Sequence, residues 1–133
     1  MSTKIAVNLP VKDIAKSTHF FIGLGFARDK QLANENMQAV IVCDHITVLL
    51  VNWAHFQAIT KRQIADRATT SEVVLQLQVE NRQRVDGLAE KAFAAGAPPA
   101  KDPIDQGFLY GRSFRDPDGH HWDVFCIHQA RET

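Results

Sequence analysis

Apolar and polar residues alternate along several short stretches of the chain, with the two-residue period that is typical of half-buried β-strands. In the first of these stretches, Ala6 and Asn8 fall on the face opposite Val7. The strand-like runs in the first half of the chain cover residues 4–9, 26–31, 37–43 and 46–52. The pattern therefore predicts four strands in this half.

Between the first two strand-like runs, the apolar residues follow the longer period of an amphipathic helix. Ile14, Phe21 and Leu24 share one helical face. Asp13 is a suitable N-cap, because its carboxylate can accept a hydrogen bond from a backbone N–H of the first turn. Gly25 suits the position that follows a helix end. A second, shorter helix is predicted over residues 53–60.

The same order of elements returns in the second half of the chain. Residues 72–79 alternate, and Asn81 then takes the N-cap position of a helix that Gly96 ends. Residues 98–105 are rich in proline, so any strand there lies at a sheet edge. Residues 107–115 and 120–127 are predicted to form a β-hairpin. The chain therefore contains a β-α-β-β-β unit twice.

The repeat divides one predicted domain, residues 1–133, into two modules of an α+β fold with mixed, mostly antiparallel sheet. Module 1 covers about residues 3–60, a linker residues 61–70, and module 2 about residues 71–127. The linker contains one large apolar residue in ten. It is either a solvated connector or a mobile flap over a pocket.

The predicted hairpin carries the most informative side chains. Its turn, residues 116–119, reads Asp-Pro-Asp-Gly, in which Asp116 can accept backbone N–H groups and Gly119 tolerates a positive φ. The strand after the turn places His121 and Asp123 on one face. A carboxylate in the middle of a strand is costly to bury without a partner, so this face meets either a wet pocket or bulk solvent.

The composition is that of an ordinary globular domain, with 45% hydrophobic and 23% charged residues. Fifteen basic residues balance fifteen acidic ones and form no basic stripe, so neither nucleic acid nor a membrane is an expected partner. No apolar run approaches the roughly 20 residues that span a bilayer. With no signal-peptide core, and with Cys43 and Cys126 too few for a disulfide framework, a cytoplasmic location is expected.

Three segments carry a family resemblance: N-L-P-V-K-D at residues 8–13, F-F-I-G-L-G-F at 20–26 and Y-G-R-S-F-R-D-P-D-G-H-H-W-D at 110–123. In this order, within two repeated modules, they resemble the vicinal oxygen chelate superfamily. It includes glyoxalase I, extradiol dioxygenases, fosfomycin-resistance enzymes and bleomycin-resistance proteins. The resemblance covers about residues 3–127. It implies an open cup of sheet with helices on the outer face, closed within one chain or across a homodimer.

The metalloenzymes of this superfamily place a His, Glu or Gln ligand at one inward position on each of four strands. Carried over by local motif, these positions are Ala6, Val48, Val74 and Asp123. Methyl-bearing side chains cannot bind a metal, and one carboxylate falls short of the roughly three protein ligands of a catalytic site. The resemblance therefore implies a member without the metal ligands, and neither a metal nor another cofactor is expected.

Strand parity predicts which side chains face the cup: Ala6, Asn8, Val48, Leu50, Asn52, Val74, Gln76, Gln78, His121, Asp123 and Phe125. Apolar walls with a few polar groups are typical of small-molecule pockets. The polar members would equally suit an open sheet that faces water. The predicted ligand-binding residues are Asn8, Asn52, Gln76, Gln78, Tyr110, Arg112 and Phe125.

Asp123 and His121 are the candidate catalytic residues. In a semi-enclosed cup, burial would raise the pKa of Asp123 and make the carboxylate a general base. The alternative is a structural salt bridge or hydrogen bond from Arg112 or Arg115 on the neighbouring strand. Tyr110 and Arg112 share a face, and suit either an anionic or aromatic ligand or a surface cross-strand pair.

Two functions from different classes remain open at this stage. The first is a metal-independent binder of a small molecule, of the bleomycin-resistance type. The second is a small-molecule enzyme of the same superfamily, such as a glyoxalase-like lyase or isomerase or a dioxygenase-like enzyme. It would use Asp123 as a base, or a metal site that the sequence does not reveal. In either case a small-molecule ligand and a second copy of the chain are the expected partners.

Overall fold

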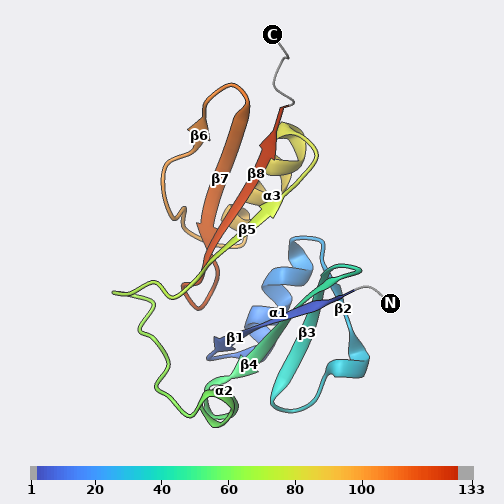
Figure 1. Cartoon of the computed structure of the whole chain (residues 1–133), viewed down its shortest axis with the longest axis vertical. Helices are drawn as coiled ribbons and strands as arrows, with labels where there is room; N and C mark the ends of the chain where they lie inside the picture. Colours follow the sequence, from blue (N-terminus) through green and yellow to red (C-terminus); the bar gives the residue numbers. More distant parts are fainter. Residues whose placement is uncertain (1–2, 129–133) are drawn as a thin grey trace. The chain divides into compact units, whose positions relative to one another are not determined.

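The computed structural model describes residues 3–128, which fall into two compact units with the boundary between Asp66 and Arg67 (Figure 1). We call these units the first and second module. Residues 61–73, which precede the first strand of the second module, contain neither helix nor strand. The prediction that part of this segment acts as a connector or a flap stays a prediction.

The first module contains a four-stranded sheet in the order β1-β4-β3-β2. Its β1 and β4 run parallel, and the other neighbours are antiparallel. Its elements are β1 (Ile5–Val11), α1 (Ile14–Gly23), β2 (Ala27–Arg28), the 3-10 helix η1 (Lys30–Leu32), β3 (Met37–Cys43), β4 (Ile46–Asn52) and α2 (Trp53–Thr60).

The second module repeats this topology in the order β5-β8-β7-β6, again with one parallel pair, β5 and β8. Its elements are β5 (Val74–Gln78), α3 (Arg82–Ala94), β6 (Ile104–Asp105), β7 (Leu109–Arg115) and β8 (His121–Ile127). The predicted α+β fold of two β-α-β-β-β modules with mixed, mostly antiparallel sheet is confirmed. Within the described residues, no helix is long and apolar enough to cross a membrane.

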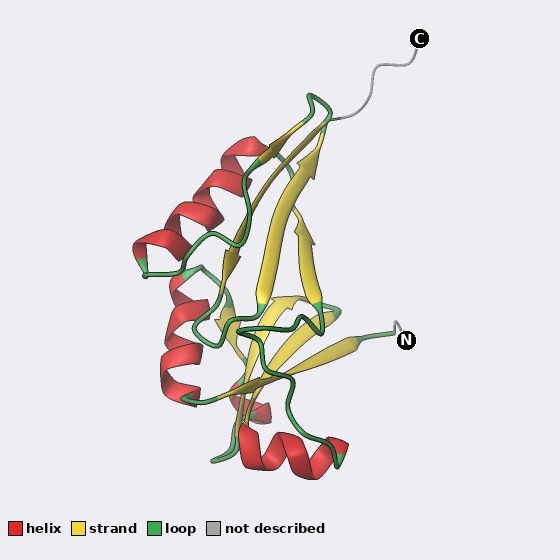
Figure 2. Ribbon diagram, turned by 90° about the vertical axis from the view of Figure 1, so that its left-hand side faces the viewer, coloured by secondary structure: helices red, strands yellow, loops and turns green. Residues whose placement is uncertain are grey.

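One face of each sheet is covered by a helix of the same module (Figure 2). The helices begin where the sequence predicted, since Asp13 accepts a hydrogen bond from the N–H of Lys16 and Asn81 from that of Arg84. They end before Gly25 and Gly96, whose φ angles of 107° and 98° lie in the region that glycine tolerates best. The predicted caps and stops are therefore confirmed.

The register of the first module corrects the predicted cup face. β1 pairs with β4 so that Asn8 lies opposite Leu49, and Leu9 opposite Leu50. Because paired residues share a face, Ala6 and Asn8 lie on one side of the sheet and Val48, Leu50 and Asn52 on the other. Leu50 is fully buried on the side that α1 covers. The residues alternate within each strand as predicted. Periodicity alone, however, does not decide which residues of one strand share a face with which residues of the next strand.

The strand predicted over residues 26–31 was too long. Only Ala27–Arg28 pair with β3, and the chain then turns into η1, where the side chain of Asp29 accepts a hydrogen bond from the N–H of Gln31. A local bond of an Asp side chain to a nearby N–H competes with strand pairing. The shortened β2 therefore covers only two residues of the outer edge of β3.

The turn between β7 and β8 is built around a buried carboxylate. Oδ1 of Asp116 accepts hydrogen bonds from the N–H groups of Asp118 and His120, and Oδ2 accepts one from Trp122 Nε1 at 3.0 Å. Gly119 has a φ of 87°, as its place in the turn requires. Burial raises the pKa of Asp116, and these hydrogen bonds and His120 oppose that shift. The predicted turn is confirmed, and it also fixes the indole of Trp122 in the core.

Candidate functional site

A half-enclosed hollow of about 320 Å³ lies in the second module. We call it the second-module hollow. It is lined by Gln76, Lys101, Ile104, Phe108, Leu109, Gly111, Arg112, Asp123, Phe125 and Ile127. Most of these residues are apolar, and the charged and amide groups are few. This is the composition that small-molecule sites favour.

The sheet register gathers the polar groups of the hollow. Asp123, in the middle of β8, has Gln76 of β5 on one side and Ser113 of β7 on the other. The three side chains therefore share the face opposite α3. Trp122 and Val124 point the other way and are fully buried. The predicted placement of Gln76, His121, Asp123 and Phe125 on one face of this sheet agrees with the register.

Asp123 is buried, with 7% of its surface exposed, and both of its oxygens are bonded. Oδ1 lies 2.7 Å from His121 Nε2, and Oδ2 accepts a hydrogen bond of 3.1 Å from Gln76 Nε2. The ammonium of Lys101 lies 3.5 Å from the same Oδ2. The partners of this carboxylate are therefore not Arg112 and Arg115, which the sequence had suggested.

Those contacts reverse the expected shift of the Asp123 pKa. Burial is the strongest single influence and raises the pKa, but the hydrogen bonds from Gln76 and His121 and the charges of His121 and Lys101 together outweigh it. The net result is a lowered pKa. The expectation of a raised value was wrong, because it considered burial without the partners. Asp123 is thus a carboxylate at neutral pH and a poor proton acceptor.

Lys101 is held at the hollow by a buried serine. Ser113 Oγ accepts a hydrogen bond of 3.0 Å from the Lys101 N–H and donates one of 3.3 Å to the Lys101 carbonyl. Ser113 is 1% exposed, whereas the side chain of Lys101 is 46% exposed. The backbone of this loop residue is therefore anchored, while its ammonium group stays accessible beside Asp123.

The apolar wall of the hollow contains a glycine in the middle of a strand. Gly111 lies opposite Phe125 in the β7–β8 ladder. A Cβ at Gly111 would lie 3.3 Å from the Cβ of Phe125, which is tighter than ordinary packing. A glycine inside a strand often marks a place where another group approaches the backbone closely. Here the missing side chain avoids a close contact with the Cβ of Phe125 in the wall of the hollow.

The other predicted ligand-binding residues are not gathered here. Gln78 is exposed at the end of β5 and does not line the hollow. Asn52 caps α2 by accepting a hydrogen bond from the His55 N–H and donates one to Asn36, while Asn8 lies exposed on the opposite face of the first sheet. These positions give Asn52 a structural role.

Tyr110 and Arg112 extend from β7 toward α3, on the face opposite Asp123. Tyr110 Oη donates a hydrogen bond of 2.6 Å to Asp86, and Arg112 bonds both Asp86 and Glu90. Arg112 also reaches the rim of the hollow. Both side chains therefore bond to α3 and not to each other as a cross-strand pair. A ligand-binding role for them stays a prediction.

Lys101, Gly111 and Ser113 were not predicted as site residues. Lys101 lies in a loop that has no periodicity to assign it to a face. Gly111 and Ser113 alternate with the predicted Tyr110 and Arg112, so reading the other parity of the same strand would have found both. The predicted strand is present, but its residues Tyr110 and Arg112, predicted to bind a ligand, lie on the face toward α3.

The residues at the four positions implied by the family resemblance offer little to a metal. Among residues 3–128, no group of three or more His, Cys, Asp and Glu side chains is placed to hold an ion. Of the four, Val48 is buried on the α1 side and Val74 is exposed. Asp123 has its own protein partners on both oxygens. The donor set therefore does not fit the metal of the metalloenzymes.

Comparison with known proteins identifies the class. The family model of the glyoxalase/bleomycin resistance protein/dioxygenase superfamily matches residues 5–124, so the chain belongs to this superfamily. A search of curated proteins found no significant match.

Solved structures show the same fold. The hypothetical protein SA1046 from S. aureus is 29% identical, with a TM-score of 0.80 over 96% of this chain and 95% of that one. A glyoxalase/bleomycin resistance protein/dioxygenase family enzyme from Burkholderia phytofirmans PsJN is 18% identical, with a TM-score of 0.78 over 95% and 99%. The fosfomycin resistance protein FosX from Listeria monocytogenes is 16% identical, with a TM-score of 0.68 over 99% and 96%.

Proposed function

We propose that this protein binds a small organic molecule in the second-module hollow, without a protein-held metal. The observation that carries the proposal is a charged, hydrogen-bonded carboxylate beside a largely apolar hollow of about 320 Å³. A buried carboxylate is costly unless it is paired, and Asp123 is paired with Gln76, His121 and Lys101 on this sheet face. Its role in the proposal is to orient Gln76 and Lys101 toward the ligand.

The orientation of Gln76 indicates the chemistry of the ligand. A carboxylate only accepts hydrogen bonds, so the amide nitrogen of Gln76 must face Asp123, and its Oε1 is left to accept a bond. The ammonium of Lys101 can donate to a carbonyl or carboxylate oxygen. The wall formed by Gly111 and Phe125 favours a flat apolar body. The proposed ligand is an aromatic compound that carries one N–H or O–H donor and one carbonyl or carboxylate acceptor.

The test is a thermal-shift screen of small aromatic amides, acids and carbonyl compounds, with hits confirmed by titration calorimetry. Asp123→Asn is the informative variant. An asparagine cannot accept bonds from both Gln76 and His121 on two oxygens, so Gln76 loses its fixed orientation. We expect affinity to fall by roughly 1–3 kcal/mol. Hits that bind the variant as well as they bind the unmodified protein would contradict the proposal.

A second candidate function is proton transfer by His121, favoured by the 2.7 Å contact of its Nε2 with Asp123. A carboxylate in that position fixes the imidazole so that Nδ1 can accept a proton in the neutral ring. If this enzyme function holds, His121→Gln lowers turnover of a bound carbonyl compound by about 10²–10⁴-fold with little change in affinity. If the protein only binds the compound, no turnover is detected in either the unmodified protein or the His121→Gln variant.

We also propose that the protein is a cytoplasmic homodimer. In support, β1 and β5 each end the strand order of their own sheet, and unpaired strand edges favour pairing with another chain. The exposed apolar residues Ile5 and Val74 lie on these strands. Light scattering at micromolar concentration should give the mass of two chains. A mass of one chain would contradict the homodimer.

A further inference from the structure

A second hollow, of about 920 Å³, lies within the first module. It is bounded by α1, β2, η1, the turn before β3, and β3 itself. We call it the α1 hollow. Its lining residues are Ile14, Ala15, Thr18, His19, Ile22, Phe26, Ala27, Arg28, Lys30, Asn34, Glu35 and Gln38. It shares no residue with the second-module hollow, and the proposed function does not use it.

The shortness of β2 creates the space. Only two residues of β2 pair with β3 before η1 turns away, so the outer part of the sheet next to α1 is left without a full strand. The apolar side chains of Ile14, Ile22 and Phe26 form part of the lining. A ligand with an apolar body would therefore find contact surface in the hollow.

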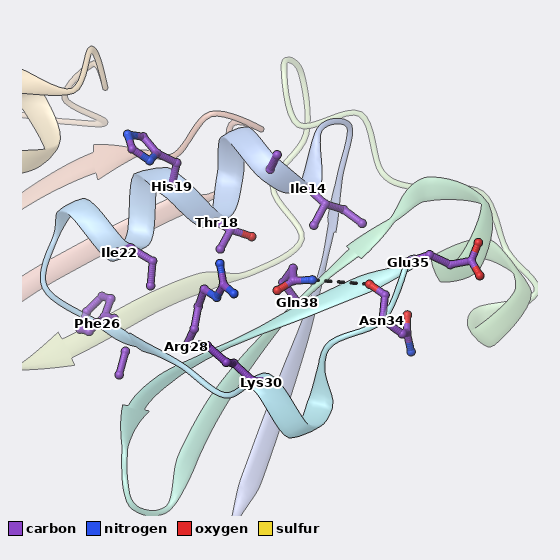
Figure 3. A pocket seen from close by; sticks show the side chains of 12 residues that line it. Ile14, Thr18, His19, Ile22, Phe26, Arg28, Lys30, Asn34, Glu35 and Gln38 are labelled. Carbon is purple, nitrogen blue, oxygen red and sulfur yellow. Dashed lines mark hydrogen bonds between the residues drawn. The ribbon is translucent and has the colours of Figure 1, made fainter.

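The charged groups of the α1 hollow favour an anion. Arg28 and Lys30 contribute two cations and Glu35 one anion, while His19 adds a further cation when protonated. No hydrogen bond or ion pair joins the side chain of Arg28 to another described residue. In Figure 3 the Arg28 guanidinium extends toward α1, whereas the Glu35 carboxylate points away from it. The Arg28 guanidinium, which is the strongest hydrogen-bond donor in the hollow, thus has no acidic partner among the described residues.

A buried hydroxyl provides an independent observation. Thr18 is 5% exposed, and its Oγ1 has no hydrogen-bond partner among the described residues. In Figure 3 the Thr18 side chain projects from α1 on the side of the Arg28 guanidinium, with its hydroxyl oxygen turned to one side. An unsatisfied buried hydroxyl is unfavourable, and it would be relieved by an acceptor oxygen bound between helix and strand.

We propose that the α1 hollow is a binding site for a small organic anion. The anionic head, a carboxylate or a phosphate monoester, pairs with the Arg28 guanidinium, whose donors match two oxygens at once. The Thr18 hydroxyl rotates to donate to the same head. The body of the ligand packs against Ile22 and Phe26. Gln38, which donates a weak 3.5 Å bond to the Asn34 carbonyl, also lines the hollow.

The test uses phenyl phosphate and benzoate as probes and benzyl alcohol as their neutral counterpart. Amide NMR spectra of the isotope-labelled full chain are followed during each titration. We expect saturable shifts at Ile22, Phe26 and Arg28 with at least one anion, and none there with benzyl alcohol. Because Gln76 and Phe125 report on the other hollow, failure here is distinguishable from failure of the proposed function.

Two variants complete the test, with Arg62→Gln as the matched control at an exposed arginine outside the hollow. Arg28→Gln should weaken the anion about tenfold or more, and Thr18→Val about threefold. Arg62→Gln should leave affinity unchanged. The proposal is overturned if neither anion gives saturable shifts at these amides, if benzyl alcohol binds equally well, or if either hollow variant binds like the unmodified protein.

Discussion

The two modules share a topology but differ in how their polar groups are satisfied. In the second module, Asp116, Ser113 and Asp123 are buried and each has hydrogen-bond partners. In the first module, Ser17 and Thr18 are equally buried, and their hydroxyls have none among the described residues. The same fold therefore contains buried polar groups with hydrogen-bond partners in one module and buried hydroxyls without such partners in the other.

Strand order alone does not make a binding site. Both modules present a sheet face opposite their helix, yet only in the second does a carboxylate organise its neighbours there. In the first module the corresponding face carries Ala6, Asn8 and Leu49, and the larger hollow lies on the helix side instead. The two modules are thus expected to differ in turn stability, in acid response and in ligand chemistry.

The largest expected difference lies in the two hairpin turns. Asp116→Ala removes the acceptor of three hydrogen bonds and leaves the Trp122 indole N–H buried without its partner. We expect the free energy of unfolding to fall by about 3 kcal/mol. Asp44→Ala, at the exposed turn of the first module, should change it by less than about 0.5 kcal/mol. Urea unfolding checks both values, and equal losses would remove this contrast between the modules.

The buried serines offer the next contrast. Ser113→Ala breaks both bonds to the backbone of Lys101 and should cost about 1–2 kcal/mol. Ser17→Ala removes a hydroxyl that has no partner among the described residues, so it should be neutral or stabilise the protein by up to about 1 kcal/mol. Thermal unfolding measures the pair. A comparable loss in Ser17→Ala would show that its hydroxyl is satisfied in solution.

A smaller effect concerns acid stability. The hydrogen bond from Tyr110 is the strongest influence on Asp86 and lowers its pKa, aided by Arg112 against the opposing effect of burial. The folded-state pKa is therefore below the unfolded value of about 4, so this stabilisation is present above that pH and is lost as pH falls through the folded-state pKa.

Asp86→Asn should consequently lower the free energy of unfolding at pH 7, by about 0.5–1 kcal/mol for this half-exposed group. The difference between the two proteins should shrink toward pH 2.5. The raised pKa of Asp116 acts in the opposite direction, but it is common to both proteins and cancels in the comparison. A difference that stays constant with pH would exclude an ionic role for Asp86.

Much of the fold follows from local signals in the sequence. Asp13 and Asn81 cap helices through their own nearby N–H groups, and Gly25 and Gly96 end them with positive φ, so each is readable from a few residues. Two copies of the same order of elements then predict the α+β architecture. The shortened β2 could not be foreseen as readily, because a local side-chain bond such as that of Asp29 competes with strand pairing.

The site was less predictable, since it depends on contacts between segments distant in sequence. Asp123 and Gln76 are separated by 47 residues, and only the β5–β8 register shows that they touch. The hydrogen bonds from Gln76 and His121, with a smaller contribution from the charge of the loop residue Lys101, reverse the Asp123 pKa shift expected from burial alone. Parity correctly predicted the face of β8, but it could not decide which face of β7 lies beside that face, or which faces of β1 and β4 coincide in the other sheet.

The most direct test of the central claim is to fill the second-module hollow. Gly111→Val places methyl groups beside Phe125, since a Cβ at position 111 would by itself lie 3.3 Å from the Phe125 Cβ. The matched control is Gly87→Ala in α3, where an added Cβ meets nothing within 4 Å. The aromatic hits from the thermal-shift screen are titrated into both variants and followed by amide NMR. We predict that they shift Gln76 and Phe125 in the control and lose binding at least tenfold in a folded Gly111→Val protein. Unchanged affinity in Gly111→Val would contradict the claim that this hollow is the ligand site.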